Sequence, residues 1–337
     1  MKSVVIREPG VLTIESRPLP EPMAGEVRIK VQYASICGSD VHIWHGYNPF
    51  ARYPRVIGHE FFGVIDMLGA GIDSKRLGDK VSVDPVVSCG HCYPCSVGRP
   101  NVCTELQVIG VHRDGGFSEY VCVPAVNAYS IPESIPDKLA SLVEPFTIAA
   151  NICAFVKPMH QDVALIYGAG PIGLTVIQVL KKVYGVSQVI VADRLTERLA
   201  IARDNGADVM LDNSEILLAD QLRGIRPTLI IDAACHPSIL AEAIGLASPA
   251  ARIGLLGFSG EPSIITQQSI TSKEISLFTS RLNSHRFPTV IDWLDRGLIE
   301  PEKLVTHYLP LSQVEKAMTI FENDPRGCCK VILSIGQ

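Results

Sequence analysis

The chain places four cysteines in one short stretch, Cys89, Cys92, Cys95 and Cys103, with two, two and seven residues between them. Loops of this length let four thiolates converge on one tetrahedral Zn²⁺, with Zn–S distances of about 2.3 Å. Because all four ligands are sulfur, no position stays open for a substrate, and the pattern predicts a structural zinc site. A reactive or disulfide-bonded cluster and an iron–sulfur cluster are the alternatives, and the rest of the sequence favours neither.

A second set of metal-binding residue types lies outside this stretch: Cys37, His59, Glu60 and Glu144. A thiolate, an imidazole and one or two carboxylates suit a catalytic zinc that keeps one coordination position open. Taken singly, a cysteine and a histidine are more often a buried thiol and a hydrogen-bonded loop residue. Their neighbours in the sequence, described below, favour the zinc-ligand role instead.

A third pattern is typical of a dinucleotide site. The run Gly168-Ala169-Gly170-Pro171-Ile172-Gly173 fits G-x-G-x-x-G, follows an apolar strand-like run and opens a helical segment, and Asp193 stands twenty residues beyond its last glycine. The first glycine permits the tight turn, the second lets a pyrophosphate approach the backbone, and the third allows close helix–strand packing. The Asp193 carboxylate would accept hydrogen bonds from the ribose and repel a 2′-phosphate, which favours NAD over NADP, although Arg194 beside it weakens this preference. A tight turn without a ligand is the alternative.

The elements that must position these residues differ along the chain. Short β-type runs at 27–31, 61–65 and 80–83, separated by Gly and Pro turns, predict an antiparallel, barrel-like domain. From about residue 160, apolar runs at 163–167, 189–192, 209–211, 229–231 and 253–256 alternate with helical segments, which predicts parallel βαβ units. A helix over 196–205, a helix over 314–321 and a terminal strand over 330–333 are also expected. The predicted fold is α/β, with domains over 1–150 and 151–286, a cysteine lobe at about 85–105, and a return of 287–337 to the first domain.

Composition excludes several classes of protein. The 337 residues are 47% hydrophobic, with a net charge of −5 and no basic tract of the kind that binds nucleic acid or an anionic membrane. The N-terminal residues lack the apolar core of a signal peptide, and glycines and a proline interrupt the apolar stretch 163–180. We therefore expect a cytoplasmic protein that does not span a membrane.

The surroundings of the second ligand set carry a family resemblance. Cys37 lies in Ile36-Cys37-Gly38-Ser39-Asp40-Val41-His42, and His59 lies in Gly58-His59-Glu60-Phe61-Phe62-Gly63-Val64. With the cysteine lobe and the glycine-rich turn, in that order, the whole chain resembles the zinc-containing medium-chain alcohol dehydrogenase family, and within it the polyol, threonine and sugar-acid branch. The resemblance implies a GroES-like antiparallel β catalytic domain and a Rossmann domain with a doubly wound parallel sheet, with the active site in the cleft between them, in a homo-oligomer that is a dimer or a tetramer.

The resemblance also implies roles for single residues. Cys37 and His59 match two catalytic zinc ligands, and Glu60 matches the acid that can approach the metal. Glu144 falls where many relatives have a cysteine as third ligand, so which glutamate binds directly stays open. Ser39 matches the hydroxyl that accepts the substrate proton, and His42 matches the end of the relay to solvent. The protein would then hold two Zn²⁺ per chain, one catalytic and one structural.

The expected reaction transfers hydride from a secondary alcohol of a small polyol or sugar acid to NAD, giving a ketone. An L-threonine-type or simple-alcohol substrate is the alternative. Two other classes remain: a regulatory zinc-binding protein on a dehydrogenase scaffold, and a zinc-independent quinone or enone reductase. A polar pocket, with Arg113 or Arg281 available to pair with a carboxylate, would suit the sugar acid; its candidate residues are His45, Tyr47, Asn48, Arg113, Asn283 and His285.

Overall fold

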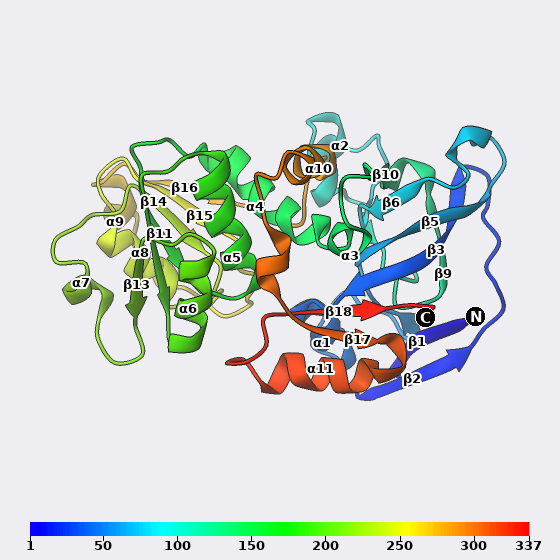
Figure 1. The fold of residues 1–337 in the computed structure, drawn as a ribbon. Helices are drawn as coiled ribbons and strands as arrows, with labels where there is room; N and C mark the ends of the chain where they lie inside the picture. Colours follow the sequence, from blue (N-terminus) through cyan, green and yellow to red (C-terminus); the bar gives the residue numbers. More distant parts are fainter. Residues whose placement is uncertain (337) are drawn as a thin grey trace. The chain divides into compact units, whose positions relative to one another are not determined.

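The computed structural model describes residues 1–336, which divide into two compact units. Unit 1 comprises Met1–Glu144, Ser284–Asp295 and the segment from Val305 onward. Unit 2 comprises Pro145–Asn283 and Arg296–Leu304. Each unit has its own β-sheet structure, and Figure 1 shows both units with most of the strand and helix labels used below.

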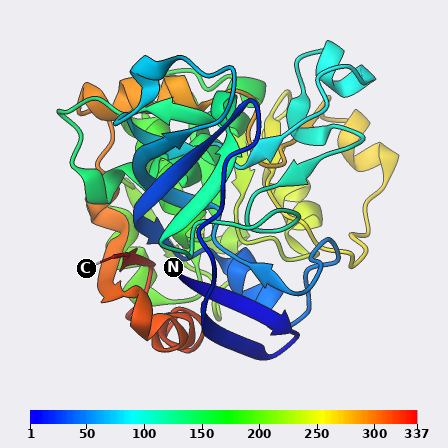
Figure 2. The ribbon, with the colours of Figure 1, turned by 90° about the vertical axis from the view of Figure 1, so that its right-hand side faces the viewer.

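Unit 1 is built on strands that run mostly antiparallel. Its largest sheet has the order β10-β6-β5-β3-β18-β17, with β9 also paired to β3, and smaller sheets are formed by β2-β1-β4 and β7-β8. The strands are β1 (Lys2–Glu8), β2 (Val11–Ser16), β3 (Glu26–Ser35), β4 (Arg55–Val56), β5 (Glu60–Leu68), β6 (Lys80–Val83), β7 (Val86–Val87), β8 (Gln107–Val108), β9 (Tyr120–Pro124), β10 (Ala128–Ser130), β17 (Val305–Pro310) and β18 (Lys330–Ser334). Strands β17 and β18 depart from the antiparallel pattern, because they run parallel. Figure 2 shows the β1–β2 hairpin in dark blue.

Strand β3 is the centre of unit 1. It pairs antiparallel with β5, β9 and β18, so the last strand of the chain lies directly beside one of the first. In this register Ser35 faces Glu60 on β5 and Ile332 on β18. The strand therefore brings residues of distant sequence position together at its carboxyl end, just before Cys37.

The helices of unit 1 are short and lie between strands. They are α1 (Gly38–Trp44), α2 (Tyr93–Ser96), α3 (Asp137–Ala140), α10 (Phe287–Asp295) and α11 (Val314–Asn323), with 3-10 turns η1 (Ser74–Arg76), η2 (Pro100–Val102), η3 (Ala125–Asn127) and η6 (Leu311–Gln313). Helix α4 (Val143–Val156) begins in unit 1 with Val143 and Glu144 and continues in unit 2.

Unit 2 has a six-stranded, wholly parallel sheet with helices on its faces (Figure 1). Its strands are β11 (Val163–Tyr167), β12 (Gln188–Asp193), β13 (Val209–Asp212), β14 (Leu229–Asp232), β15 (Arg252–Leu255) and β16 (Ser276–Thr279). Its helices are the remainder of α4, α5 (Pro171–Gln178), the π-helical turn η4 (Val179–Val183), α6 (Thr196–Asp204), α7 (Leu218–Gln221), α8 (Ile239–Leu246), α9 (Gln267–Thr271) and the 3-10 turn η5 (Pro301–Leu304).

The strand order β13-β12-β11-β14-β15-β16 reverses direction at β11, which is the arrangement of a Rossmann domain. The apolar runs that predicted these strands are buried because helices cover both faces, as parallel sheets require. The predicted fold class is confirmed. In the part of the chain that the structure describes, none of the helices combines the length and apolar character needed to cross a membrane.

Candidate metal centres and nucleotide site

The four cysteines of the lobe come together in a stretch with few buried side chains. Cys92 precedes α2 and Cys103 ends η2, and most side chains over 89–99 are exposed or half-buried. The Cys103 thiol accepts hydrogen bonds from the backbone N–H groups of Cys89 and Glu105, both at 3.3 Å. On the far side of the lobe, the Ser284 hydroxyl donates to the Gly98 carbonyl at 2.8 Å.

The spacing of the sulfur atoms fits a tetrahedral zinc. The Sγ atoms of Cys92 and Cys95 are 3.4 Å apart, those of Cys92 and Cys103 are 3.7 Å apart, and all four lie within 4.8 Å of one another. A tetrahedron with Zn–S bonds of about 2.3 Å has sulfur–sulfur edges of about 3.8 Å. A disulfide needs about 2.05 Å, and all ten cysteines are free thiols. Backbone N–H groups of Thr104 and Cys95 lower the pKa of the Cys92 thiol to about 5, which favours the thiolate that binds metal.

The second ligand set gathers in the interior of unit 1. Cys37 lies in the short link from β3 to α1, immediately before the helix, and His59 lies immediately before β5. Ligand atoms of Cys37, His59 and Glu60 all lie within 4.8 Å of one another. The Ser39 hydroxyl, in the first turn of α1, is 3.4 Å from His59 Nε2.

Asp40 fixes this arrangement by orienting backbone groups of the turn, as its place after Cys37 predicts. Its fully buried carboxylate accepts hydrogen bonds from the backbone N–H groups of Cys37 at 2.9 Å and Gly58 at 3.2 Å. The other ring nitrogen of His59, Nδ1, lies 3.5 Å from Asp40 Oδ1 and has no hydrogen-bond partner among the described residues. Burial lowers the pKa of His59, but Asp40 and Cys37 outweigh it and raise that pKa well above its usual value. A carboxylate beside Nδ1 leaves Nε2 available to a metal.

Glu60 is held by a residue from the far end of the sequence. The Lys330 ammonium, 1% exposed, donates to Glu60 Oε1 at 2.7 Å and to the Ile36 carbonyl at 2.9 Å, while the Ser35 hydroxyl donates to Glu60 Oε2. Burial lowers the pKa of Lys330, but Glu60 and Cys37 raise it more, so the ammonium stays charged. Both Glu60 oxygens thus have donors besides any metal.

Glu144 lies near this cluster without joining it. It is 3% exposed, and its carboxylate interacts electrostatically with His59, Glu60 and Lys330, yet its oxygens are not among the ligand atoms within 4.8 Å. Burial, with Glu60 adding to it and His59 opposing it, raises the pKa of Glu144 to about 8. The carboxyl group therefore favours its neutral form until a cation is placed beside it.

In unit 2 the glycine-rich turn connects β11 to α5. Gly168 has φ +93°, and a Cβ on Gly173 would stand 1.9 Å from the Gly168 carbonyl oxygen, so both positions need glycine. A Cβ on Gly170 would meet only Arg198 Nη1, at 3.9 Å. Pro171 and Ile172 then begin the helix. The space over Gly170, at a helix N-terminus, fits a pyrophosphate.

Asp193 ends β12 beside this turn. Its Oδ2 accepts from the Ala169 N–H at 2.7 Å and its Oδ1 from the Leu195 N–H at 2.9 Å, so the carboxylate is anchored at the turn. Arg194 is exposed. Arg198, on α6, is the cation nearest to Gly170. Its role could not be predicted from the sequence, because it is one of several charged residues on that helix.

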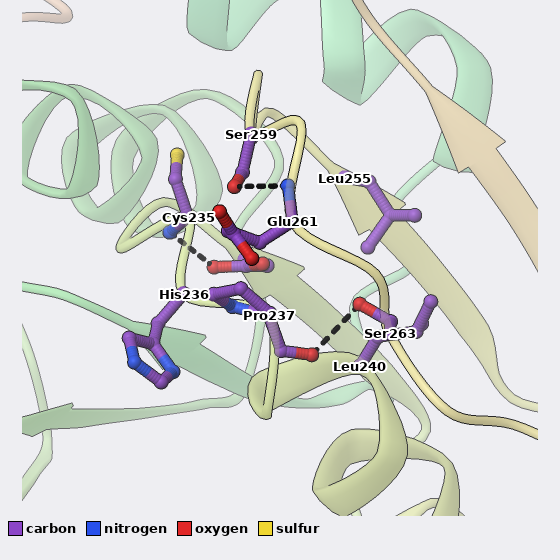
Figure 3. A pocket seen from close by; sticks show the side chains of 10 residues that line it. Cys235, His236, Pro237, Leu240, Leu255, Ser259, Glu261 and Ser263 are labelled. Atoms are coloured by element: carbon purple, nitrogen blue, oxygen red, sulfur yellow. Dashed lines mark hydrogen bonds between the residues drawn. The ribbon is translucent and has the colours of Figure 1, made fainter.

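A small cavity of about 110 Å³ lies at the carboxyl ends of β14 and β15, and Figure 3 shows its lining. Asp232 Oδ1 accepts from the Cys235 N–H at 2.8 Å, and the Ser263 hydroxyl donates to the Pro237 carbonyl at 2.7 Å. Ligands of open α/β sheets bind at this edge, next to the strand where the order reverses.

Comparison with known proteins decides the family. Residues 23–133 match the model of the alcohol dehydrogenase GroES-like domain, and residues 171–296 match that of the zinc-binding dehydrogenases. The chain is 61% identical over its full length, and over the full length of the relative, to the starvation-sensing protein RspB of Escherichia coli K12. The chain belongs to the zinc-binding alcohol dehydrogenase family. It is an oxidoreductase of the zinc-dependent, NAD(P)-dependent class, as the sequence predicted.

Other relatives have named activities. The chain is 33% identical to L-threonine 3-dehydrogenase of Bacillus subtilis, covering 94% of this chain and 93% of that one. It is 34% identical to L-galactonate-5-dehydrogenase of E. coli K12, covering 93% and 92%. A crystal structure of the rspB alcohol dehydrogenase of E. coli CFT073 with NADH superposes with a TM-score of 0.97, at 60% identity and 99% coverage of both chains.

Three further candidates of this alcohol dehydrogenase have partners within unit 1. His42 is exposed on α1, one turn after Ser39, and contacts Tyr47 edge-on at 6.4 Å between ring centroids. His45 pairs with Glu322 on α11 at 3.0 Å. Arg113 pairs with Glu26 at 2.5 Å, so it already has a carboxylate within the protein.

Proposed function

We propose that this dehydrogenase oxidises a secondary hydroxyl of a small polyol or sugar acid to a ketone, with NAD as the hydride acceptor. The observation that carries the proposal is the cluster of half-buried Cys37 with buried His59 and Glu60, and with the Ser39 hydroxyl beside His59. The relatives named L-threonine 3-dehydrogenase and L-galactonate-5-dehydrogenase support a small, polar substrate.

We propose two zinc ions per chain. The four thiolates of the lobe would hold one, and Cys37, His59 and either Glu60 or Glu144 the other. At the second site the bound metal supplies Lewis-acid polarisation of the substrate hydroxyl, and NAD bound over the glycine-rich turn supplies the acceptor for hydride. Unit 1 would thus carry the metal chemistry and unit 2 the cofactor.

The chain's own residues move the proton and set the charge. The Ser39 hydroxyl, 3.4 Å from His59 Nε2, would accept the proton of a substrate hydroxyl bound at the cluster. His42 follows one helical turn later on the solvent side and would pass that proton to water. Asp40 holds His59 in orientation, and Lys330 balances the charge of Glu60.

A substrate panel tests the proposal. Purified protein is assayed with NAD and with NADP, in both directions, on polyols, sugar acids, L-threonine and simple alcohols. We expect turnover of one polyol or sugar acid with NAD. Turnover of L-threonine or of a simple alcohol alone would refute the substrate class, and zinc binding without any turnover would favour a regulatory protein.

Zinc should stabilise the protein more as pH rises. Glu144 has a folded pKa of about 8 against about 4.3 unfolded, so its contribution to zinc-free stability is present below about pH 4.3 and is lost as pH rises towards 8. His59 has a raised pKa and loses its contribution in the same direction. We expect the difference in Tm between zinc-loaded and zinc-free protein to grow from pH 5 to pH 8. In Cys37→Ala, which keeps the lobe, it should grow less; equal growth would contradict the assignment of this site.

Cofactor choice should depend on Asp193. Asp193→Ser removes the carboxylate beside the ribose position, so we expect the preference for NAD over NADP to fall about tenfold, or about 1.4 kcal/mol, or to invert with Arg194 nearby. Asp212→Ser is a matched control, because Asp212 ends the neighbouring strand β13 in register with Asp193. The measurement is kcat/KM for each cofactor. A wild-type preference for NADP would show that the role of Asp193 is wrong.

The proton path should depend on His42 and not on His45. His42→Ala should lower kcat most at low pH, where the substrate proton leaves least readily, and added imidazole should restore part of the rate. His45→Ala is the control, because His45 lies at the end of the same helix but pairs with Glu322. NAD affinity should stay unchanged in both variants. Equal effects in the two would argue against the relay.

We also propose that the protein is a cytoplasmic homo-oligomer. Its ten free thiols suit a reducing compartment. Strand β16 ends the sheet of unit 2, with Leu277 37% exposed on it, and such an edge can pair with a second copy. Light scattering of wild-type protein and of Leu277→Lys tests this, and a wild-type monomer would refute it.

A further inference from the structure

Besides the small cavity of unit 2, the protein has a larger cavity in unit 1. The lining of this larger cavity includes none of the candidate zinc ligands. Its volume is about 470 Å³, within the range of sites for small molecules. The segment after β2, strand β4 and the approach to β9 form its walls. Its lining includes Arg17, Pro20, Arg55, Arg113, Asp114 and Tyr120.

The walls carry more positive than negative charge. Arg17 Nη1 and Arg55 Nη1 both donate to the single carboxylate of Asp114, at 3.0 and 2.9 Å. The same carboxylate accepts from the Val56 N–H at 3.2 Å, and Arg113 is balanced by Glu26. Three guanidinium groups of the lining are therefore paired with two carboxylates, those of Asp114 and Glu26. Among residues 1–336, Arg55 Nε is buried without a hydrogen-bond partner.

This combination is that of an anion site. Guanidinium groups present planar sets of N–H donors that match carboxylate and phosphate oxygens, and Asp114 cannot use all the donors of two arginines at once. We propose that the cavity binds a small organic anion, bearing a phosphate or carboxylate group, at Arg17 and Arg55. None of the lining residues belongs to either candidate zinc centre or to the glycine-rich turn of unit 2.

The cavity is joined to the candidate zinc ligand His59 through the backbone. Asp114 holds strand β4, which leads directly to His59. The residues after Asp114 follow that segment, with N–H donation from Gly115 to the Val56 carbonyl at 2.8 Å and from Phe117 to the Ile57 carbonyl at 3.0 Å. An anion that replaces Asp114 at one arginine would change how this segment is held, and so would act on the metal centre from outside it.

Calorimetric titration of the full-length protein tests the binding. The probes are inorganic phosphate and glucose 6-phosphate, with glucose as the uncharged control and NADH present in excess to fill the phosphate position over the glycine-rich turn. We expect glucose 6-phosphate to bind one equivalent and Arg17→Gln to weaken it at least tenfold. Arg7→Gln, an equal loss of charge at an arginine that pairs with Glu15 outside the cavity, should leave it unchanged.

Several outcomes would overturn the inference. They are no binding of either anion by the wild-type protein, equal affinity in Arg17→Gln, equal weakening in Arg7→Gln, and binding of glucose as tight as that of glucose 6-phosphate. Binding of inorganic phosphate with the same dependence on Arg17 would support the site and show that the anionic group alone suffices.

Hydrogen exchange tests the connection to His59. In the wild-type protein, glucose 6-phosphate should change the exchange rate of the amides over 55–59 at least twofold, and in Arg17→Gln it should not. Because neither measurement uses turnover, failure here is distinguishable from failure of the proposed reaction. An unchanged exchange rate over 55–59 with the ligand bound would overturn the connection.

Discussion

Cys95→Ser is expected to remove one zinc per chain and to unfold the lobe over 89–103. The lobe has no apolar core of its own, since Tyr93 is 78% and Val97 50% exposed, so we expect metal coordination to supply its folding free energy. A serine hydroxyl is a poor zinc ligand beside three thiolates. We expect elemental analysis to fall from two zinc ions to one, and hydrogen exchange over 89–103 to accelerate at least tenfold while β11 to β16 stay protected.

The control is Cys122→Ser. Burial raises the pKa of Cys122 to about 11, so this thiol is not a thiolate at neutral pH and should bind no metal. Zinc content and lobe protection should match those of the wild-type protein. If Cys95→Ser keeps two zinc ions and full protection, the thiolates of the lobe do not hold a structural metal.

Sequence reasoning predicted the parts of the molecule whose signals are local. The apolar run 163–167 coincides with β11, and the strands around it lie within a few residues of their predicted bounds, because buried parallel strands are continuous apolar runs. The predicted helix over 196–205 is α6, and Gly206 follows it with φ +106°. The glycine-rich turn could also be predicted from the sequence, since only glycine fits at Gly168 and Gly173.

The sequence could not show contacts that depend on distant pairing. Lys330 is the first residue of an apolar strand, and nothing in its neighbouring residues indicates a function. It contacts Glu60 only because β18 pairs with β3 and β3 pairs with β5. Asp40 lies nineteen residues before His59 in the sequence, so its contact with His59 Nδ1 could not be read from either segment alone. Arg113 looked available for a substrate because its partner Glu26 lies far from it in the sequence.

Lys330→Met is expected to destabilise unit 1 strongly. The Lys330 ammonium lies 2.6 Å from the Glu60 carboxylate, and both groups are almost wholly buried. Removing one partner of a buried ion pair leaves an unpaired charge, which costs about 3–5 kcal/mol. Because the chain has two units, the free energy should be measured locally, from the denaturant dependence of hydrogen exchange at the β3 and β18 amides.

A double-variant cycle distinguishes loss of the pair from loss of packing. In Glu60→Gln/Lys330→Met neither member of the pair is left as an unpaired buried charge, so most of the stability should return, whereas a packing defect caused by the methionine side chain would persist in the double variant. Lys80→Met is the surface control, because Lys80 pairs with the exposed Glu133, and it should change stability little. The zinc content of the double variant then reports on Glu60 itself. If it keeps both ions, Glu144 is the carboxylate ligand; if it keeps only the lobe zinc, Glu60 is.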